Sequence, residues 1–273
     1  MVGLGRMALP IELLKHAGRI PELFVATRLT PSYVPLIRRY LEFEKLDYPF
    51  ELPLTNGRTL TLSSQAEVAV FWQIFVRQCY RMPAGCRTIL DAGANVGMYV
   101  VWAAGAQPEA RIVALEPFPT TYLALEKNIR ANKLETRVRS SRIGLAAQTG
   151  DRFIKTAGPS PNRGVVLHDL EVSTEDTVRV PCMSLTECLQ YHELESIDLL
   201  KMDIEGSEWE VLLSTPTPVL RSIRHIQLEY HAVHARFGYT PEKLFAHLAA
   251  GGHQLTFRQE DAQRTGIAYF KLT

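Results

Sequence analysis

Short apolar segments alternate with helical patterns from residue 88 to the end of the chain. The apolar segments predict strands over residues 88–92, 111–115, 137–143, 197–202 and 223–229. Helical patterns lie between them at 97–106, at 119–132 and from residue 207 onward. Short apolar strands separated by helices are typical of a parallel sheet that is covered on both faces. The pattern therefore predicts a doubly wound α/β fold.

The C-terminal part of the pattern predicts one reversed strand. Thr240-Pro241-Glu242 begins a helix and Gly251-Gly252 ends it. Two strands follow, at 253–258 and 267–272, and the polar loop between them is too short for a helical crossover, so they should pair antiparallel. We expect a mostly parallel, seven-stranded sheet with one antiparallel edge strand.

The chain before residue 64 has a different pattern. Residues 9–46 are helical in pattern but are interrupted by prolines, and residues 50–62 predict a hairpin around Asn56-Gly57. Ser64-Gln65-Ala66-Glu67 is a capping box that begins the next helix. We expect an N-terminal helical extension with a hairpin over residues 1–63 and a second domain over 64–273. Within the second domain, the Gly-, Pro- and polar-rich residues 144–183 predict an insertion with short strands, a candidate lid over a substrate.

Composition narrows the class of protein. The chain has 273 residues, of which 46% are hydrophobic and 22% are charged, as in an ordinary globular protein. Its net charge of +1 creates no field that would attract a nucleic acid. No run approaches the roughly 18 apolar residues of a membrane span, and Glu12 and Lys15 interrupt any signal-peptide core. We expect a cytoplasmic protein with reduced cysteines, and the apolar faces of the short N-terminal helices would allow a homodimer.

The strongest local motif is Asp91-Ala92-Gly93-Ala94-Asn95-Val96-Gly97, which follows one predicted strand and begins a helix. Gly93 and Gly97 allow a tight turn and a close approach of the backbone to a ligand. Glu116 ends the next strand, 19 residues after Gly97, where a carboxylate accepts hydrogen bonds from a ribose diol. Together these features indicate a cofactor that contains a nucleoside.

The same turn favours one cofactor over another. A dinucleotide needs hydrogen-bond donors for its pyrophosphate, whereas Asp91 would repel phosphate and would attract an ammonium group. The spacing is also Gly-x-x-x-Gly rather than the Gly-x-Gly-x-x-Gly of dinucleotide sites. S-adenosylmethionine, in which an amino acid replaces the phosphates, fits these residues better than NAD.

Further acidic residues follow two later strands. Asp203 and Glu205 come after the strand at 197–202, and Glu229 and His231 come at the end of the strand at 223–229. Ligands of open α/β sheets bind beyond the carboxyl ends of the strands, so these side chains should lie beside the cofactor. Each acidic residue alone is more often a helix cap or an ion-pair partner than a catalytic group, but three carboxylates and a histidine at one edge indicate a site.

These motifs resemble those of the FkbM family of S-adenosylmethionine-dependent methyltransferases. The resemblance rests on Asp91–Gly97, Glu116-Pro117, Asn128, Lys201–Glu208 and Glu229-Tyr230-His231. It implies a Rossmann-like class I methyltransferase fold and O-methylation of a hydroxyl on a natural product, sugar or glycan, as in secondary metabolite biosynthesis. The Asn/Asp-Pro-Pro-Tyr signature of amino-methyltransferases is absent after the strand at 197–202, which makes methylation of nucleobase amines less expected.

The resemblance also implies roles for individual residues. The cofactor would be bound by Asp91, Gly93, Asn95 and Gly97 at its methionine part, by Glu116 at its ribose, by Gly144 near its adenine, and by Asp203. His231 is the first candidate for the general base because its unperturbed pKa is about 6.5, and Asp203 or Glu205 is the second. Alternatively, His231 has no catalytic role and is a structural partner of Glu229. His168 and Tyr80 are further candidates to face the methyl acceptor.

Three alternatives stay open at this point. Asp203, Glu205 and Glu229 could gather around Mg²⁺, which prefers carboxylate oxygens, although metal-independent chemistry is favoured and no metal ligand is assigned. An RNA or protein methyltransferase on the same fold is disfavoured by the neutral charge and the absence of an Arg/aromatic stripe. A nucleotide-binding protein without transferase activity, or a dehydrogenase, is the remaining class.

Overall fold

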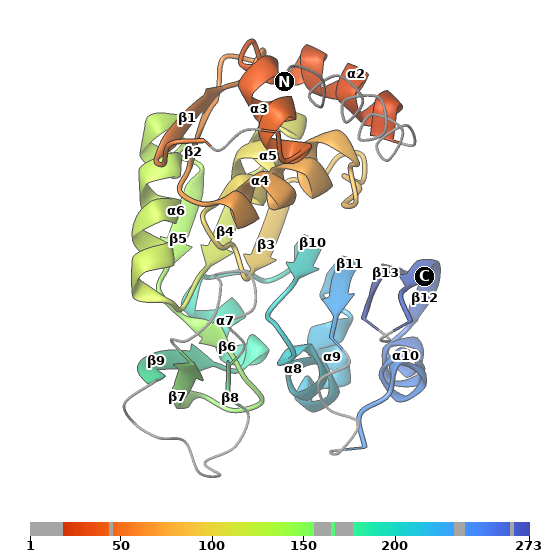
Figure 1. Ribbon diagram of the computed structural model, residues 1–273. Helices are drawn as coiled ribbons and strands as arrows, with labels where there is room; N and C mark the ends of the chain where they lie inside the picture. Colours follow the sequence, from red (N-terminus) through yellow and green to blue (C-terminus); the bar gives the residue numbers. More distant parts are fainter. Residues whose placement is uncertain (1–18, 44–45, 156–164, 167–176, 232–237, 263–264) are drawn as a thin grey trace, which may run out of the picture. The chain divides into compact units, whose positions relative to one another are not determined.

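The computed structural model describes residues 19–43, 46–155, 165–166, 177–231, 238–262 and 265–273 (Figure 1). The chain forms two compact units, Met1–Cys79 and Tyr80–Thr273, and each is described by itself. The boundary therefore lies after Cys79 and not after residue 63, where the sequence analysis placed it. The helix that begins at Gln65 packs with elements of the first unit, and its amphipathic pattern alone does not reveal on which unit its apolar face packs.

The first unit contains the predicted helices and hairpin. Its elements are α2 (Ile20–Leu29), α3 (Tyr33–Tyr40), β1 (Phe50–Pro53), β2 (Thr59–Leu62), α4 (Gln65–Phe71) and the π-helical turn η2 (Trp72–Val76). Strands β1 and β2 pair antiparallel, as expected. Helix α4 begins at the expected cap, because the Ser64 side chain accepts a hydrogen bond from the Glu67 N–H. Helix α4 packs with α3 and β2, and α2 packs with η2.

The Glu22 carboxylate links three elements of the first unit. It accepts hydrogen bonds from the Tyr40 hydroxyl (2.8 Å), from Nε1 of Trp72 (2.9 Å) and from Nε of Arg77 (2.8 Å). The rings of Tyr40 and Trp72 stack with their centroids 3.8 Å apart. Burial opposes the charged form, but the hydrogen bonds from Arg77 and Tyr40 outweigh it and lower the pKa of the Glu22 carboxyl. The first unit thus has a charged hydrogen-bond centre beside its apolar core.

Replacing this carboxylate should destabilise the protein. We expect Glu22→Gln to reduce the free energy of unfolding by about 1–3 kcal/mol, because hydrogen bonds to a charged group are lost while the side-chain size is kept. Denaturant unfolding followed by tryptophan fluorescence measures this change. Glu42→Gln, at an exposed position of the same unit, is the matched control, and equal midpoints for the two variants would contradict the role of Glu22.

The second unit is built around the predicted seven-stranded sheet. Its strands are β3 (Thr88–Ala92), β4 (Arg111–Leu115), β5 (Val138–Ser141), β10 (Ile197–Met202), β11 (Ile223–Tyr230), β12 (His253–Glu260) and β13 (Gly266–Leu272), in the order β12-β13-β11-β10-β3-β4-β5. All neighbouring pairs are parallel except those that β13 makes with β11 and β12. The one reversed strand is confirmed. It lies one place inside the edge, because β12 pairs along its outer side.

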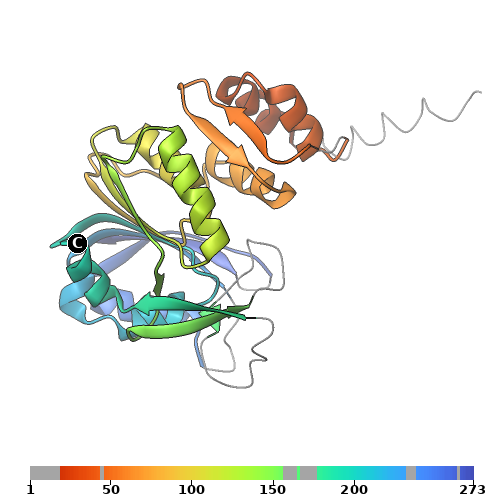
Figure 2. The same ribbon diagram turned by 90° about the vertical axis from the view of Figure 1, so that its left-hand side faces the viewer.

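Helices cover both faces of this sheet, as a doubly wound fold requires. They are α5 (Met98–Ala106), α6 (Pro119–Ala131), α7 (Leu185–Tyr191), α8 (Glu208–Ser214), α9 (Thr217–Leu220) and α10 (Pro241–Ala250). Figures 1 and 2 show α8, α9 and α10 together on one side of the sheet and α5 and α6 on the other. Side chains from α7, α8 and α10 form one buried core with strands β3, β4, β10 and β11. The predicted α/β fold is confirmed, and no helix of the described segments is long and apolar enough to cross a membrane.

The predicted insertion forms a second, smaller sheet. Strands β6 (Gly144–Leu145), β7 (Gly150–Lys155), β8 (Val165–Val166) and β9 (Thr177–Met183) pair in the order β6-β9-β7-β8. The short strands expected here are therefore present. Residues 156–164 and 167–176 of the candidate lid lie outside the described residues, so a lid function stays a prediction.

Candidate active site

A pocket lies at the carboxyl ends of β3, β4 and β10, where the topology of an open α/β sheet places ligands. Strand β3 stands between β4 and β10 in the sheet. The residues that follow β4 and β10 therefore lie on opposite sides of the turn that follows β3. Strands β6 and β7 of the smaller sheet supply another part of the wall, through Gly144, Leu145 and Ile154.

The glycine turn after β3 is held tightly against its neighbours. Gly93 has φ +79°, and a Cβ atom there would lie 1.8 Å from the main-chain oxygen of Asp203. The N–H groups of Gly93 and Ala94 both donate to the Leu115 oxygen, at 3.0 and 2.9 Å. Asn95 also has a positive φ, of 50°, and both Gly93 and Asn95 line the pocket. A residue without a side chain is therefore required at position 93 by the packing of β3 against β10.

The other two predicted glycines serve packing first. Gly97 has φ +87°, begins α5, and would bring a Cβ atom within 2.7 Å of Cδ1 of Leu125. It is not among the residues that line the pocket. Gly144 does line the pocket, and a Cβ atom on it would lie 2.8 Å from Sγ of Cys182. A direct contact of Gly144 with a cofactor stays a prediction.

The carboxylate of Glu116 lies in the wall of the pocket, as predicted. Its two oxygens accept hydrogen bonds from the N–H groups of Asn95 (3.0 Å) and Phe118 (2.9 Å). Burial nevertheless outweighs these hydrogen bonds and raises the pKa of Glu116 to about 7. Each oxygen of a carboxylate has a second acceptor position, so this anchored group suits a ligand with two adjacent hydroxyls.

The structure does not bring Asp91 into the pocket wall. Its side chain is fully buried, and Oδ1 lies 3.2 Å from Nζ of Lys201. Lys201 also donates to the Gly93 oxygen, at 3.0 Å. Burial alone would lower the pKa of Lys201, but the charges of Asp91 and Asp203 outweigh it and raise that pKa. The observed contact of Asp91 is thus a buried ion pair beneath the turn, and a contact with the methionine part of a cofactor stays a prediction.

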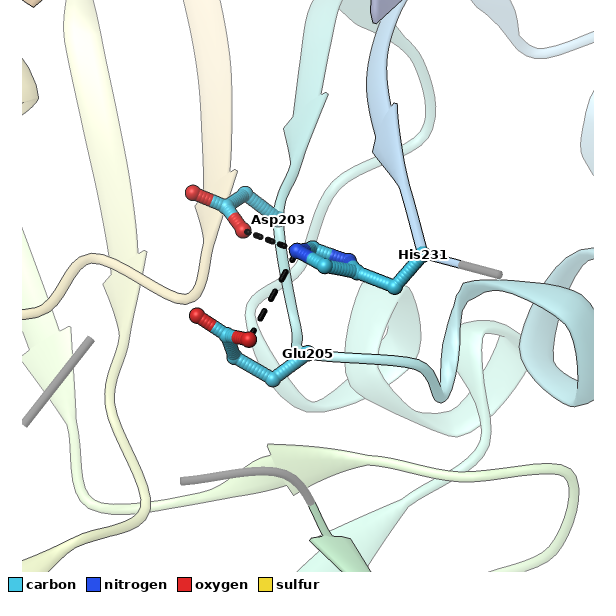
Figure 3. A group of neighbouring side chains, drawn as sticks. All are labelled: Asp203, Glu205 and His231. Atoms are coloured by element: carbon cyan, nitrogen blue, oxygen red, sulfur yellow. Dashed lines mark ion pairs between the residues drawn. The ribbon is translucent and has the colours of Figure 1, made fainter. Parts of the chain in front are cut away.

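Asp203 and Glu205 line the pocket, and His231 lies beside them (Figure 3). The Nε2 atom of His231 is 3.5 Å from Oε2 of Glu205 and 4.0 Å from Oδ1 of Asp203. The three side chains come from the ends of β10 and β11, and they point toward one another. We refer to Asp203, Glu205 and His231 as the acidic-histidine cluster.

The sequence analysis missed the residue that orients His231. Oε1 of Glu208 lies 3.2 Å from Nδ1 of His231. Glu208 is fully buried and also accepts hydrogen bonds from the N–H groups of Ile204 (2.8 Å) and Gly206 (2.9 Å). Its place at the start of α8 is typical of a helix cap, so the sequence carried no separate signal for its contact with the histidine.

The carboxylates around His231 change its protonation. Burial would lower the pKa of the imidazole, but the hydrogen bond to Glu208 and the charges of Glu208, Asp203 and Glu205 raise it to about 10. Burial and the charge of Asp203 raise the pKa of Glu205 to about 8. His231 therefore carries a positive charge at neutral pH in this arrangement.

Glu229 is held by a different partner from the one expected. It accepts a 2.7 Å hydrogen bond from the hydroxyl of Tyr80, which also lies 3.4 Å from Oδ2 of Asp203. Burial raises the pKa of Glu229 to about 7. Glu229 is not among the pocket-lining residues, and the observed carboxylate partner of Nδ1 in His231 is Glu208. His168, the other candidate to face the acceptor, lies outside the described residues.

The fold and this pocket define a Rossmann-like protein with a pocket at the carboxyl edge of its sheet. The model of the methyltransferase FkbM domain matches residues 91–258. The chain therefore belongs to the FkbM methyltransferase family and is a methyltransferase. The match begins at Asp91 and spans the glycine turn, Glu116 and the acidic-histidine cluster.

Several curated proteins with related sequences are named methyltransferases. Methyltransferase sdnD of Sordaria araneosa is 28% identical over 59% of this chain and 73% of its own length. The hexuronic acid methyltransferase AglP of Haloferax volcanii is 31% identical over 52% of this chain and 55% of its own length. The 31-O-demethyl-FK506 methyltransferase FkbM of Streptomyces tacrolimicus is 25% identical over 72% of this chain and 87% of its own length.

The tight contact at Gly93 leads to a stability test with a matched control. Gly93 (φ +79°) and Gly85 (φ +73°) have similar backbone conformations, but a Cβ atom at Gly85 would meet nothing within 4 Å. Gly85→Ala should cost only the backbone strain, about 1–2 kcal/mol. We expect Gly93→Ala to lower the thermal midpoint at least about twice as much, because β3 and β10 must also separate. Equal midpoints in thermal denaturation would contradict the close packing.

Proposed function

We propose that the protein is an S-adenosylmethionine-dependent O-methyltransferase that acts on a hydroxyl of a small molecule, natural product or sugar. The observation that carries this proposal is the charge of the pocket wall. Among the described residues, its ionisable side chains are the acidic groups of Glu116, Asp203 and Glu205, and it contains no lysine, arginine or histidine. Such a wall repels the pyrophosphate of a dinucleotide and attracts a cation.

The residues present fit S-adenosylmethionine. Glu116 would accept hydrogen bonds from both ribose hydroxyls, since each of its oxygens already holds one backbone N–H and has an acceptor position left. Gly93 and Asn95 would bring the backbone of the turn close to the ligand, and Asp203 on the opposite side would attract its ammonium group. When bound, this cofactor supplies a methyl group on a positively charged sulfur.

The acidic-histidine cluster would hold the methyl acceptor. Its carboxylates line the same pocket as Glu116, so an acceptor hydroxyl hydrogen-bonded to Asp203 or Glu205 would be oriented toward the cofactor. Holding two reactants in line supplies much of the rate in such a transfer. The cluster would also receive the proton that the hydroxyl loses. His231 itself is a poor base here, because its pKa is raised to about 10, and we assign it the role of positioning the two carboxylates.

The names of the relatives support an oxygen acceptor. One relative is named for a hexuronic acid and another for a 31-O-demethyl compound. Transfer to RNA is disfavoured by the acidic pocket wall, which would repel a phosphate backbone. Cytoplasmic location, a homodimer and a place in secondary metabolite biosynthesis stay predictions.

Cofactor binding is the first test. We expect calorimetric titration of the full chain to show binding of S-adenosylhomocysteine and none of NAD. Glu116→Gln should weaken this binding about 10- to 100-fold, because hydrogen bonds to a charged group are lost. Glu109→Gln, at an exposed position, is the control and should bind like the unaltered chain. A preference for NAD would overturn the proposed cofactor.

The same titration should depend on pH. Glu116 has a pKa of about 7 in the free protein, where burial raises it, the two N–H groups and Lys201 lower it, and Asp91 raises it. The hydroxyls need its charged form, so affinity should fall by up to about tenfold per pH unit below pH 7 and level off above about pH 8. Glu116→Gln should lack this component between pH 5.5 and 8. An unaltered pH dependence in this variant would contradict the role of Glu116.

Methyl transfer is the second test. We expect the full chain to move a radiolabelled methyl group from S-adenosylmethionine to a member of a panel of uronic acids, sugars and hydroxylated natural products. Glu205→Gln should lower kcat by about 10²- to 10⁴-fold while the affinity for S-adenosylhomocysteine stays the same, and Glu109→Gln should leave both unchanged. Label that enters RNA or protein instead would favour the alternative class of acceptor.

A further inference from the structure

We propose that Asp203, Glu205 and His231 bind one divalent transition-metal cation, which holds the oxygen of the methyl acceptor. The proposal rests on the proposed function, since it assigns the cation to the acceptor side of the same pocket. Its basis is the geometry of the acidic-histidine cluster and the way in which buried residues support it.

The distances in the cluster suit metal ligands better than hydrogen bonds. Nε2 of His231 lies 3.5 and 4.0 Å from carboxylate oxygens of Glu205 and Asp203, whereas N–H···O bonds are about 2.7–3.2 Å long. Two ligand atoms that are each about 2.1 Å from one ion lie about 3–4.2 Å apart. One ligand atom from each residue lies within 4.8 Å of the others, so a small inward movement would complete the site.

The orientation of His231 is set from outside the cluster. Glu208 takes Nδ1 of the ring, at 3.2 Å, and this carboxylate is itself fully buried and fixed by the N–H groups of Ile204 and Gly206. Nε2 is thereby directed at the two remaining carboxylates (Figure 3). A carboxylate behind a histidine, with the opposite ring nitrogen facing other ligand groups, is the usual support of a metal-binding imidazole.

Lys201, a positively charged side chain near Asp203, is bound mainly by other groups. Nζ of Lys201 is 3.8 Å from Oδ2 of Asp203, but it lies closer to Asp91 (3.2 Å) and to the Gly93 oxygen (3.0 Å). The described pocket wall contains no basic side chain. The side chains of Asp203, Glu205 and His231 are 27%, 28% and 15% exposed, so an ion bound there would keep positions open for water or a hydroxyl.

The donor set indicates the kind of ion. Mg²⁺ and Ca²⁺ prefer oxygen ligands throughout, whereas an imidazole with two carboxylates suits Mn²⁺, Co²⁺, Zn²⁺ or Fe²⁺. The Mg²⁺ site considered from the sequence used Glu229 as its third ligand, and that carboxylate is bound by the Tyr80 hydroxyl. His231 takes the place that Glu229 had in that hypothesis.

A cation at this position would activate the acceptor. A hydroxyl oxygen bound to it becomes more acidic, because the ion stabilises the alkoxide. The O–H bond breaks, its electron pair stays on the bound oxygen, and the proton passes to water. With the cation bound, water receives the proton of the hydroxyl, and the carboxylates serve as ligands of the cation.

Metal binding can be measured without knowing the acceptor. The full chain, without a polyhistidine tag and freed of metal by a chelator, is titrated with Mn²⁺ by calorimetry and with Co²⁺ by visible absorption. We expect one ion per chain and cobalt bands that indicate a nitrogen ligand. His231→Ala and Glu205→Gln should abolish this binding, and Glu208→Gln should weaken it about 10- to 100-fold as a positioning residue. Glu109→Gln and His225→Gln are controls for a carboxylate and a histidine outside the cluster.

Each outcome supports or overturns the metal site. Measuring S-adenosylhomocysteine binding with the same samples distinguishes failure of the metal site from failure of the proposed function. Absence of Mn²⁺ and Co²⁺ binding in a chain that binds S-adenosylhomocysteine overturns the metal site and leaves the methyltransferase proposal standing. Equal metal affinity in the cluster variants and the controls also overturns it, because the ion then binds elsewhere. Metal binding in a chain that does not bind S-adenosylhomocysteine would support the ion site and remove the proposed cofactor. Retained S-adenosylhomocysteine binding in Glu208→Gln shows that this variant is folded.

Discussion

The site depends on one buried ion pair, between Asp91 at the end of β3 and Lys201 at the end of β10. Asp91 is fully buried and Lys201 is 3% exposed. Loss of one partner of a buried ion pair typically costs about 3–5 kcal/mol, because the other charge is left buried and unpaired. Here the ammonium contacts Asp91 and the Gly93 oxygen, and the rings of Tyr80 and Tyr99 lie 5.6 and 5.8 Å away, within the range of cation–π attraction. The charge of Lys201 is therefore stabilised by groups inside the protein.

This pair determines how closely the two strands meet at their carboxyl ends. Lys201 and Asp91 are partners in the register of β10 and β3. The Lys201 hydrogen bond to the Gly93 oxygen holds the turn down, and the main chain of Asp203 fills the space where a Cβ atom of Gly93 would be. The backbone of the turn and the carboxylate of Asp203 are thus placed in one rigid arrangement. The proposed cofactor and acceptor sites share this pocket, and methyl transfer between them would need such a fixed distance.

The same pair also explains why the pocket is acidic. Lys201 lies closer to Asp91 than to Asp203, His231 lies beside both Asp203 and Glu205, and the described pocket wall itself contains only acidic ionisable side chains. A further carboxylate, Glu229, accepts a hydrogen bond from the Tyr80 hydroxyl and is not among the pocket-lining residues. The sheet edge is divided into a neutralised part beneath the turn and a negative part that faces the ligands. Clusters of acidic groups with raised pKa values occur mainly at functional sites.

The sequence predicted the strands, their direction, the glycine turn and the position of Glu116, because periodicity and turn residues are local signals. It did not predict that Asp91 would be buried in an ion pair with Lys201. That contact depends on the register of two strands that are more than 100 residues apart in the chain. The boundary after Cys79 was missed for a related reason: an amphipathic helix shows that it has an apolar face and does not show which unit covers that face.

The protonation of His231 is the property that sequence could least reveal. An unperturbed imidazole, with a pKa of about 6.5, is a suitable base, and that value led to its selection. In the folded chain the ring lies against Glu208, Asp203 and Glu205, and its pKa is about 10. Three carboxylates around one ring stabilise positive charge at that position, whether the charge is carried by a proton or by an ion. A histidine in this setting is suited to bind a cation together with the neighbouring carboxylates. Its role follows from its surroundings more than from its own chemistry.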